Sequence, residues 1–206
     1  MPGTFNGTTL TISATPVDHA LIPDEGATNV AGIAIVGSDM YCVKTTGLKT
    51  TLLKTTDYMA TKATAVKKDL NWFALGLTKI GNYLYMLAED HKGYGGSTTI
   101  VKLDTKGNQL GTYSINEICP KGALGITAAD GTNEKFIIMH YADKSNAGTL
   151  TFSVVDWKAA KAASTFTVTN SGFGYTTQLQ DIYYHTSFGL FILTNNTFST
   201  LQNRIL

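Results

Sequence analysis

The chain has 206 residues, of which 15% are charged, and its formal net charge at pH 7 is +1. So small a net charge gives no long-range field that would draw the molecule to nucleic acid or to an anionic membrane, and neither partner is expected. No stretch approaches the roughly 18 apolar residues of a membrane-spanning helix, so no membrane span is predicted. The length suits one domain with its own hydrophobic core.

The first predicted element is a strand at Thr8–Ala14, where residues of high β propensity alternate with residues of other types. This strand belongs to none of the repeats that follow it. We favour an extracellular or surface-exposed location for the chain, although residues 1–15 lack the basic start and the apolar centre of a signal peptide.

The next elements form a hairpin that recurs. Residues Gly32–Lys44 contain a strand, a tight turn at Gly37 and a second strand, and the same pattern returns without a gap at Gly76–Ala88, with its turn at Gly81. Each copy carries a tyrosine at the same place in its second strand. Such equivalence predicts that these residues, Tyr41 and Tyr85, pack between repeats and do not bind a ligand.

Two looser copies of the hairpin follow, at Gly125–Met139 and Asp181–Leu193. After a hairpin the chain offers two more strands, joined by a turn, and the segments that show this are Thr98–Leu103, Gln109–Ile115, Thr149–Val155 and Ser164–Thr169. Antiparallel units of four strands that recur about every 40 to 55 residues resemble the blades of a β-propeller. A β-sandwich would not explain why one hairpin pattern recurs with the same internal turn.

The predicted fold is therefore all-β, a small β-propeller whose single domain covers residues 1–206. Its blades are expected at about 32–66, 76–115, 125–169 and 181–206. The last unit lacks one strand, and Thr8–Ala14 is a spare one, so we expect the N-terminal strand to complete the last blade and close the ring. The pattern resembles the four-bladed architecture of hemopexin-like domains in shape, without the terminal disulfide usual there, and it points to no specific family.

The closed ring predicts a monomer, whereas a ring of more blades would make this chain a fragment whose last sheet edge needs another chain. Two segments, Asp57–Leu70 and Asp156–Ala163, suit a helical turn as well as a strand. Both cysteines, Cys42 and Cys119, are expected to be free thiols because two cysteines at this spacing form neither a disulfide framework nor a metal site.

Ligands of propellers usually bind where the loops between second and third strands meet the segments that enter the innermost strands. The loop Glu89–Gly96 is the richest of these, because it combines carboxylates, a histidine, a lysine and a tyrosine with glycines that let a ligand come close to the backbone. With the corresponding loops of the later repeats, it defines the candidate ligand-binding residues: Glu89, Asp90, His91, Tyr94, Tyr141, Asp143, Asn195 and Asn196.

Several functions fit this set. The preferred one is a non-enzymatic, lectin-like module that recognises a glycan or a protein surface, with Tyr94 as a stacking platform and no cofactor. The alternative is a metal-assisted hydrolase or lyase with Glu89, Asp90, His91 and Asp143 at the channel mouth. A structural module of a larger surface assembly, with the loop merely solvated, is a further alternative. The sequence contains none of the common nucleophile or zinc-protease motifs.

Overall fold

The structure is a computed structural model, and it describes residues 3–5, 10–12, 29–56, 63–90, 97–130, 133–141, 149–157, 159, 161–169, 179–187 and 189–194. All the regular secondary structure in these ranges is β-strand, which confirms the all-β prediction. No helix in the described ranges has the length and the apolarity that crossing a membrane would require.

The strands form successive antiparallel sheets, and we call the first three four-stranded sheets the first, second and third blades. The strands of these blades are, in order, β3 (Asn29–Val36), β4 (Asp39–Thr46), β5 (Lys49–Thr55) and β6 (Thr64–Leu70); β7 (Trp72–Ile80), β8 (Tyr83–Asp90), β9 (Thr98–Leu103) and β10 (Gln109–Ser114); β11 (Ala123–Asp130), β12 (Lys135–Tyr141), β13 (Thr149–Asp156) and β14 (Lys161–Thr169). A two-stranded hairpin follows, β15 (Leu179–His185) and β16 (Gly189–Thr194).

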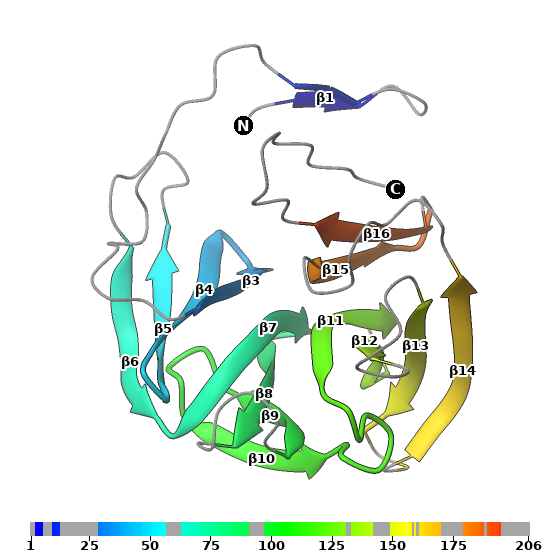
Figure 1. Cartoon of the computed structure of the whole chain (residues 1–206). Helices are drawn as coiled ribbons and strands as arrows, with labels where there is room; N and C mark the ends of the chain where they lie inside the picture. The colour runs from blue at the N-terminus through cyan, green and yellow to red at the C-terminus, as the bar shows by residue number, and fades with distance from the viewer. Residues whose placement is uncertain are drawn as a thin grey trace, which may run out of the picture.

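The sheets surround a common axis, as the blades of a β-propeller do (Figure 1). The innermost strands are β3, β7, β11 and β15, and each blade adds its later strands outward in chain order. Strand β7 packs along both β3 and β11, and β11 also packs along β15. Strands β15 and β3 meet far less, so the packing between inner strands is weakest there. The resemblance to a propeller that the sequence predicted is thus confirmed.

The ambiguous segments prove to be strands and turns where the structure describes them. Residues 64–70 form strand β6, and Asp156 and Lys161 form the end of β13 and the start of β14, paired with each other across a turn. Residues 57–62 lie outside the described ranges.

The N-terminal strand was expected to complete the last blade. Strand β2 (Leu10–Ile12) lies within the predicted Thr8–Ala14 and pairs with β1 (Gly3–Phe5) in a two-stranded sheet. Residues 195–206, which should supply the third strand of the last blade, lie outside the described ranges. The number of blades and the closure of the ring therefore stay predictions.

Each inner strand carries a β-bulge near its start. The register of the inner hairpin shifts at Ala31/Ile33 in β3, Ala74/Gly76 in β7, Ala123/Gly125 in β11 and Leu179/Asp181 in β15. Such bulges bend a strand and re-aim its side chains. Their recurrence shows that the repeat extends from the hairpin pattern to the local backbone geometry.

Glycines at these bulges let neighbouring inner strands approach closely. A Cβ added to Gly32 would lie 2.0 Å from the backbone nitrogen of Leu77 on β7, and one on Gly76 would lie 3.1 Å from a side-chain carbon of Ile126 on β11. One on Gly125 would lie 2.9 Å from an oxygen of Asp181 on β15. A glycine of one blade thus faces the next inner strand at each of these contacts.

Threonine hydroxyls join the inner strands beside these glycines. The backbone N–H of Ala128 donates to Thr78 Oγ1 at 3.2 Å, and the N–H of Tyr184 donates to Thr127 Oγ1 at 3.0 Å. Because Thr78 and Thr127 each follow the glycine of their strand by two positions, the same hydrogen bond recurs in successive blades. These bonds give backbone donors of one inner strand a side-chain acceptor on the inner strand of the preceding blade.

The hydrophobic core is divided among the faces where sheets meet. One cluster joins the first and second blades, including Tyr41, Leu52 and Met86, and another joins the second and third, including Tyr85 and Phe136. Tyr41 and Tyr85 are 2% and 0% exposed, which confirms that they pack between blades. Both cysteines are free, as predicted, and both are buried.

Candidate functional site

The predicted loop site begins at the end of β8, where the structure describes Glu89 and Asp90. Glu89 pairs with Phe73 and Asp90 with Trp72 on the inner strand β7. Successive residues of a strand point to opposite faces of the sheet, so these two carboxylates face different sides of the second blade. A ligand that both of them touch would have to reach around the end of β8.

Glu89 is a buried carboxylate, with 3% of its surface exposed. A Cβ on Gly122, which precedes β11, would lie 3.4 Å from Glu89 Oε1. The Glu89 side chain therefore lies at the junction with the third blade, against the segment that enters the next inner strand. Asp90 is only partly buried, and its backbone N–H donates to the carbonyl of Ser97 at 3.2 Å across the base of the loop.

The other predicted site residues are not brought together in the described part of the chain. His91, Tyr94, Asp143, Asn195 and Asn196 lie outside the described ranges. Tyr141 ends β12 and pairs with Leu150 on β13. Among the described residues, no group of three or more His, Cys, Asp or Glu side chains is placed to hold a metal ion.

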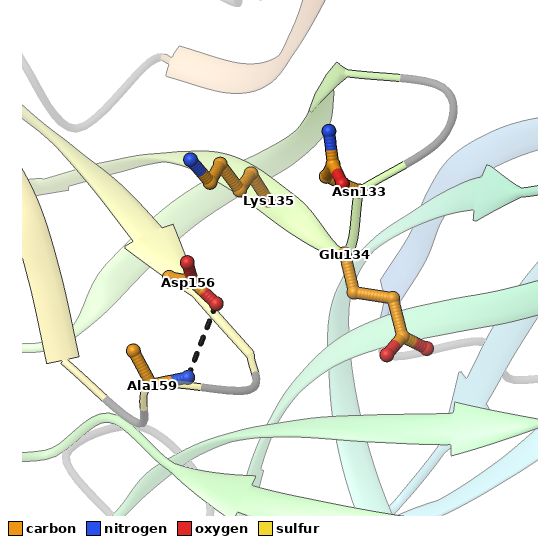
Figure 2. A pocket seen from close by; sticks show the side chains of 5 residues that line it. All are labelled: Asn133, Glu134, Lys135, Asp156 and Ala159. Atoms are coloured by element: carbon orange, nitrogen blue, oxygen red, sulfur yellow. Dashed lines mark hydrogen bonds between the residues drawn. The ribbon is translucent and has the colours of Figure 1, made fainter.

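A pocket of about 490 Å³ lies at the end of the third blade where its hairpin turns gather (Figure 2). The Asp156 carboxylate accepts the backbone N–H of Ala159 at 3.1 Å, and Lys135 also lines the pocket. Glu134 points away from both of them, toward the second blade (Figure 2). Because its carboxylate accepts hydrogen bonds from the Tyr85 hydroxyl and from Lys102, it joins two blades.

A larger cavity of about 720 Å³, which we call the central cavity, is lined by the four inner strands together with Met40 and Cys42 of β4. Most of the lining residues are apolar. Large apolar side chains of β3 and β15 line it and remain open: Ile33 is 65% exposed, Ile35 47% and Tyr183 55%. The positions equivalent to Ile33 in the other inner strands are covered, since Leu77, Ile126 and Ile182 are at most 4% exposed.

The cavity also contains a carboxylate, that of Asp181. Its Oδ1 accepts the backbone N–H of Ile182 at 2.9 Å, and the N–H of Ile126 on the neighbouring strand also donates to the carboxylate. Burial raises the pKa of Asp181 to about 7, and the two N–H donors oppose that rise without overcoming it. The site therefore holds an acid whose charge changes near neutral pH.

Sequence reasoning placed the site on the loops and missed the cavity and Asp181. A signal for both was present in the alignment of the repeats, because the inner hairpins begin with Gly32, Gly76 and Gly125 and then with Asp181. A carboxylate at a position that is otherwise glycine marks a departure from the repeat, and such departures identify positions where function or local packing differs.

No protein-family model matches the sequence, and no curated protein sequence matches it. Among solved structures, the chain is similar to glutaminyl cyclase from Myxococcus xanthus, with 12% identity, a TM-score of 0.52, and coverage of 81% of this chain and 68% of that one. It is also similar to an exo-β-1,3-galactanase from Phanerochaete chrysosporium, with 10% identity, a TM-score of 0.52, and coverage of 81% and 44%.

A third similarity is to hydrazine synthase from Kuenenia stuttgartiensis, with 13% identity, a TM-score of 0.50, and coverage of 84% of this chain and 46% of that one. The chain thus spans less than half the length of the synthase and galactanase chains that it matches. At such identities the likeness concerns the fold alone. Together with the blades around a central cavity, it shows that the chain is a β-propeller.

Proposed function

We propose that this propeller is a non-enzymatic binding module that recognises a protein surface and takes an apolar segment of that surface into the central cavity. The observation that carries the proposal is the exposure of Ile33, Ile35 and Tyr183 on inner strands. Soluble proteins seldom leave large apolar side chains together in the open, and where they do, the surface commonly binds a partner.

The apolar lining also favours a protein segment over a glycan. A glycan is bound by many hydrogen bonds to its hydroxyls together with stacking on aromatic rings, whereas most side chains in this cavity carry neither group. A glycan bound at the loops would instead depend on Tyr94, Asn195 and Asn196. Binding of that kind would contradict the proposal of an apolar protein ligand.

The test is to pan a random-peptide library and to probe a glycan array with the same purified protein. We expect apolar peptides to be enriched, and Ile33→Asp to weaken their binding at least about tenfold, because the substitution places a charge in the apolar lining. The matched control is Leu110→Asp, since Leu110 is 52% exposed but lies on the outer strand β10. This variant should bind normally.

Two results would contradict the proposal. A glycan signal that persists in Ile33→Asp and disappears in Tyr94→Ala would place the function on the loop. Peptide binding that is equally weakened by Leu110→Asp and Ile33→Asp would show that the cavity is not the site.

A further inference from the structure

Asp181 departs from the repeat at a position that is otherwise glycine. Gly76, Gly125 and Asp181 are the residues at which pairing with the second strand resumes after the bulge, and each is followed by a buried leucine or isoleucine. The same bulge forms with glycine in β7 and β11 and with aspartate in β15. The bulge therefore does not require an aspartate. The side chain itself needs an explanation.

The glycines of the neighbouring strands provide the room for this side chain. Asp181 Oδ1 lies where a Cβ on Gly125 would come within 2.9 Å, and where one on Gly76 would come within 3.4 Å. The carboxylate therefore extends from β15 over the bulges of β11 and β7, toward the axis. A Cβ at Gly125 would push the carboxylate aside, whereas one at Gly76 would lie in ordinary contact with it.

The carboxylate retains capacity for a ligand. An ionised carboxylate has about four acceptor positions. The described contacts of Asp181 supply two donors, the N–H groups of Ile182 and Ile126. The residue is partly exposed and lines the cavity, so a group in the cavity can reach its remaining acceptor positions.

Asp181 also differs from the other charged residues of the lining in its place, because it lies away from the hairpin turns. The other charged residues of the lining, Lys79 and Asp130, have opposite signs and lie at the ends of β7 and β11 near the hairpin turns. Lys79 is three residues beyond Gly76, which is about 10 Å along a strand. Burial and the N–H groups of Ile182 and Ile126 account for the shifted pKa of Asp181, and Lys79 makes no contribution to it.

We propose that Asp181 anchors a cationic group, a primary ammonium or a guanidinium, carried on the apolar segment that enters the cavity. The inference rests on the proposed function and adds the chemistry of the ligand to it. A carboxylate held among apolar walls attracts a cation strongly because little solvent screens the pair. The preferred partner segment is thus apolar with one lysine, arginine or free N-terminal amine.

The test measures the binding of three probes that share one apolar tail, n-octylammonium, n-octanol and n-octanoate, by titration calorimetry at pH 8. We expect octylammonium to bind about tenfold more tightly than octanol, and octanoate to bind more weakly than either. In Asp181→Asn, which keeps an oxygen that can accept both N–H groups, octylammonium should lose its advantage while octanol binds as before. Asp130→Asn, at the end of the cavity, is the matched control and should leave the advantage intact.

The outcomes separate the two proposals. If octanol binds as tightly as octylammonium to the wild-type protein, the anchor is wrong and the apolar cavity site stands. If none of the probes binds, the cavity is not a ligand site and the proposed function fails with the anchor. The comparison of probes on the wild-type protein decides the matter even if Asp181→Asn does not fold.

Discussion

The first and second blades, and the second and third, meet through the same repeat positions but place their tightest contacts at different distances from the axis. At the first junction the closest approach is on the inner strands, where Gly32 leaves no room for a Cβ beside Leu77. At the second junction Gly76 has more room, and the close contacts lie one strand outward, where the rings of Tyr85 and Phe136 are 4.8 Å apart. A repeated fold can therefore hold its blades together in different layers.

The tyrosines of the two junctions make the same point. Tyr41 pairs across strands with Lys54, and Tyr85 pairs with Lys102. In the first blade the carboxylate that accepts their hydrogen bonds is Asp39 of the same sheet, at 3.3 Å from the tyrosine oxygen and 3.0 Å from the lysine nitrogen.

In the second blade that carboxylate belongs to Glu134, which comes from the third blade. Lys102 also lies 4.4 Å above the ring of Tyr83. Burial, followed by the Glu134 carboxylate, raises the pKa of Tyr85 strongly, so this hydroxyl remains protonated. The tyrosine–lysine pair that recurs in the two blades thus connects neighbouring blades only where the acid comes from the next blade.

The largest expected effect is at the inner contact of the first junction. Gly32→Ala should prevent folding, because the new Cβ would lie 2.0 Å from the Leu77 nitrogen and because φ at Gly32 is +64°. The control is Gly37→Ala, where φ is +62° but nothing lies within 4 Å of the new Cβ, and it should cost only about 1 kcal/mol. Circular dichroism and urea unfolding measure both. Similar losses in the two variants would show that conformation, and not the contact with Leu77, decides the first.

The next effect concerns the acid that connects the second and third blades. Glu134→Gln should lower the free energy of unfolding by about 2 kcal/mol, because Tyr85 and Lys102 lose a charged acceptor in a largely buried setting. Asp39→Asn is the matched change in the first blade, where Lys54 is 34% and Asp39 26% exposed, and it should have little effect. Urea unfolding of both variants tests the difference. Equal losses would mean that the origin of the acid does not matter.

How far the sequence predicted this molecule depends on the distance over which each signal acts. Strands, turns and the packing of Tyr41 and Tyr85 follow from periodicity and from equivalence between repeats, which are local properties. The role of Glu134 could not be predicted in this way, because it follows a turn in one blade and its partners are in another. Asp181 was visible as a departure from glycine, but its surroundings come from strands far apart in the chain.

A third effect distinguishes Asp181 from the acids at the blade junctions. Its pKa is raised to about 7 in the folded protein, against roughly 3.9 in an unfolded chain, so between these values the folded state keeps a proton that the unfolded state has released. Stability therefore falls as the pH rises from about 4 to 7. The charged groups that share the cavity, Lys79 and Asp130, are at its end.

Asp181→Asn removes the buried charge, and with it the fall in stability between about pH 4 and pH 7. At pH 8 the variant should be more stable than the wild-type protein by about 2 kcal/mol, and at pH 4 the advantage should disappear. Urea unfolding at both pH values measures the change, and Asp130→Asn serves as the control for a cavity-lining acid. An advantage of the same size at both pH values would show that it arises from packing and not from charge.

The smallest effect compares the two thiols and concerns reactivity more than stability. Burial raises the pKa of Cys42 to about 11 and that of Cys119 to about 12. At pH 8, Cys42 should therefore react with iodoacetamide on the order of 100-fold more slowly than an ordinary thiol, and Cys119 on the order of 1,000-fold more slowly. Cys42 lines the central cavity, whereas Cys119 is packed in the cluster between the second and third blades.

We therefore expect Cys42 to react first, and we expect n-octanol in the cavity to slow the reaction of Cys42 without changing that of Cys119. Mass spectrometry of the two peptides over time measures both rates, with Cys42→Ser as the control for assignment. If Cys119 reacted first, the junction between the second and third blades would open more readily than the face of the first blade that lines the cavity.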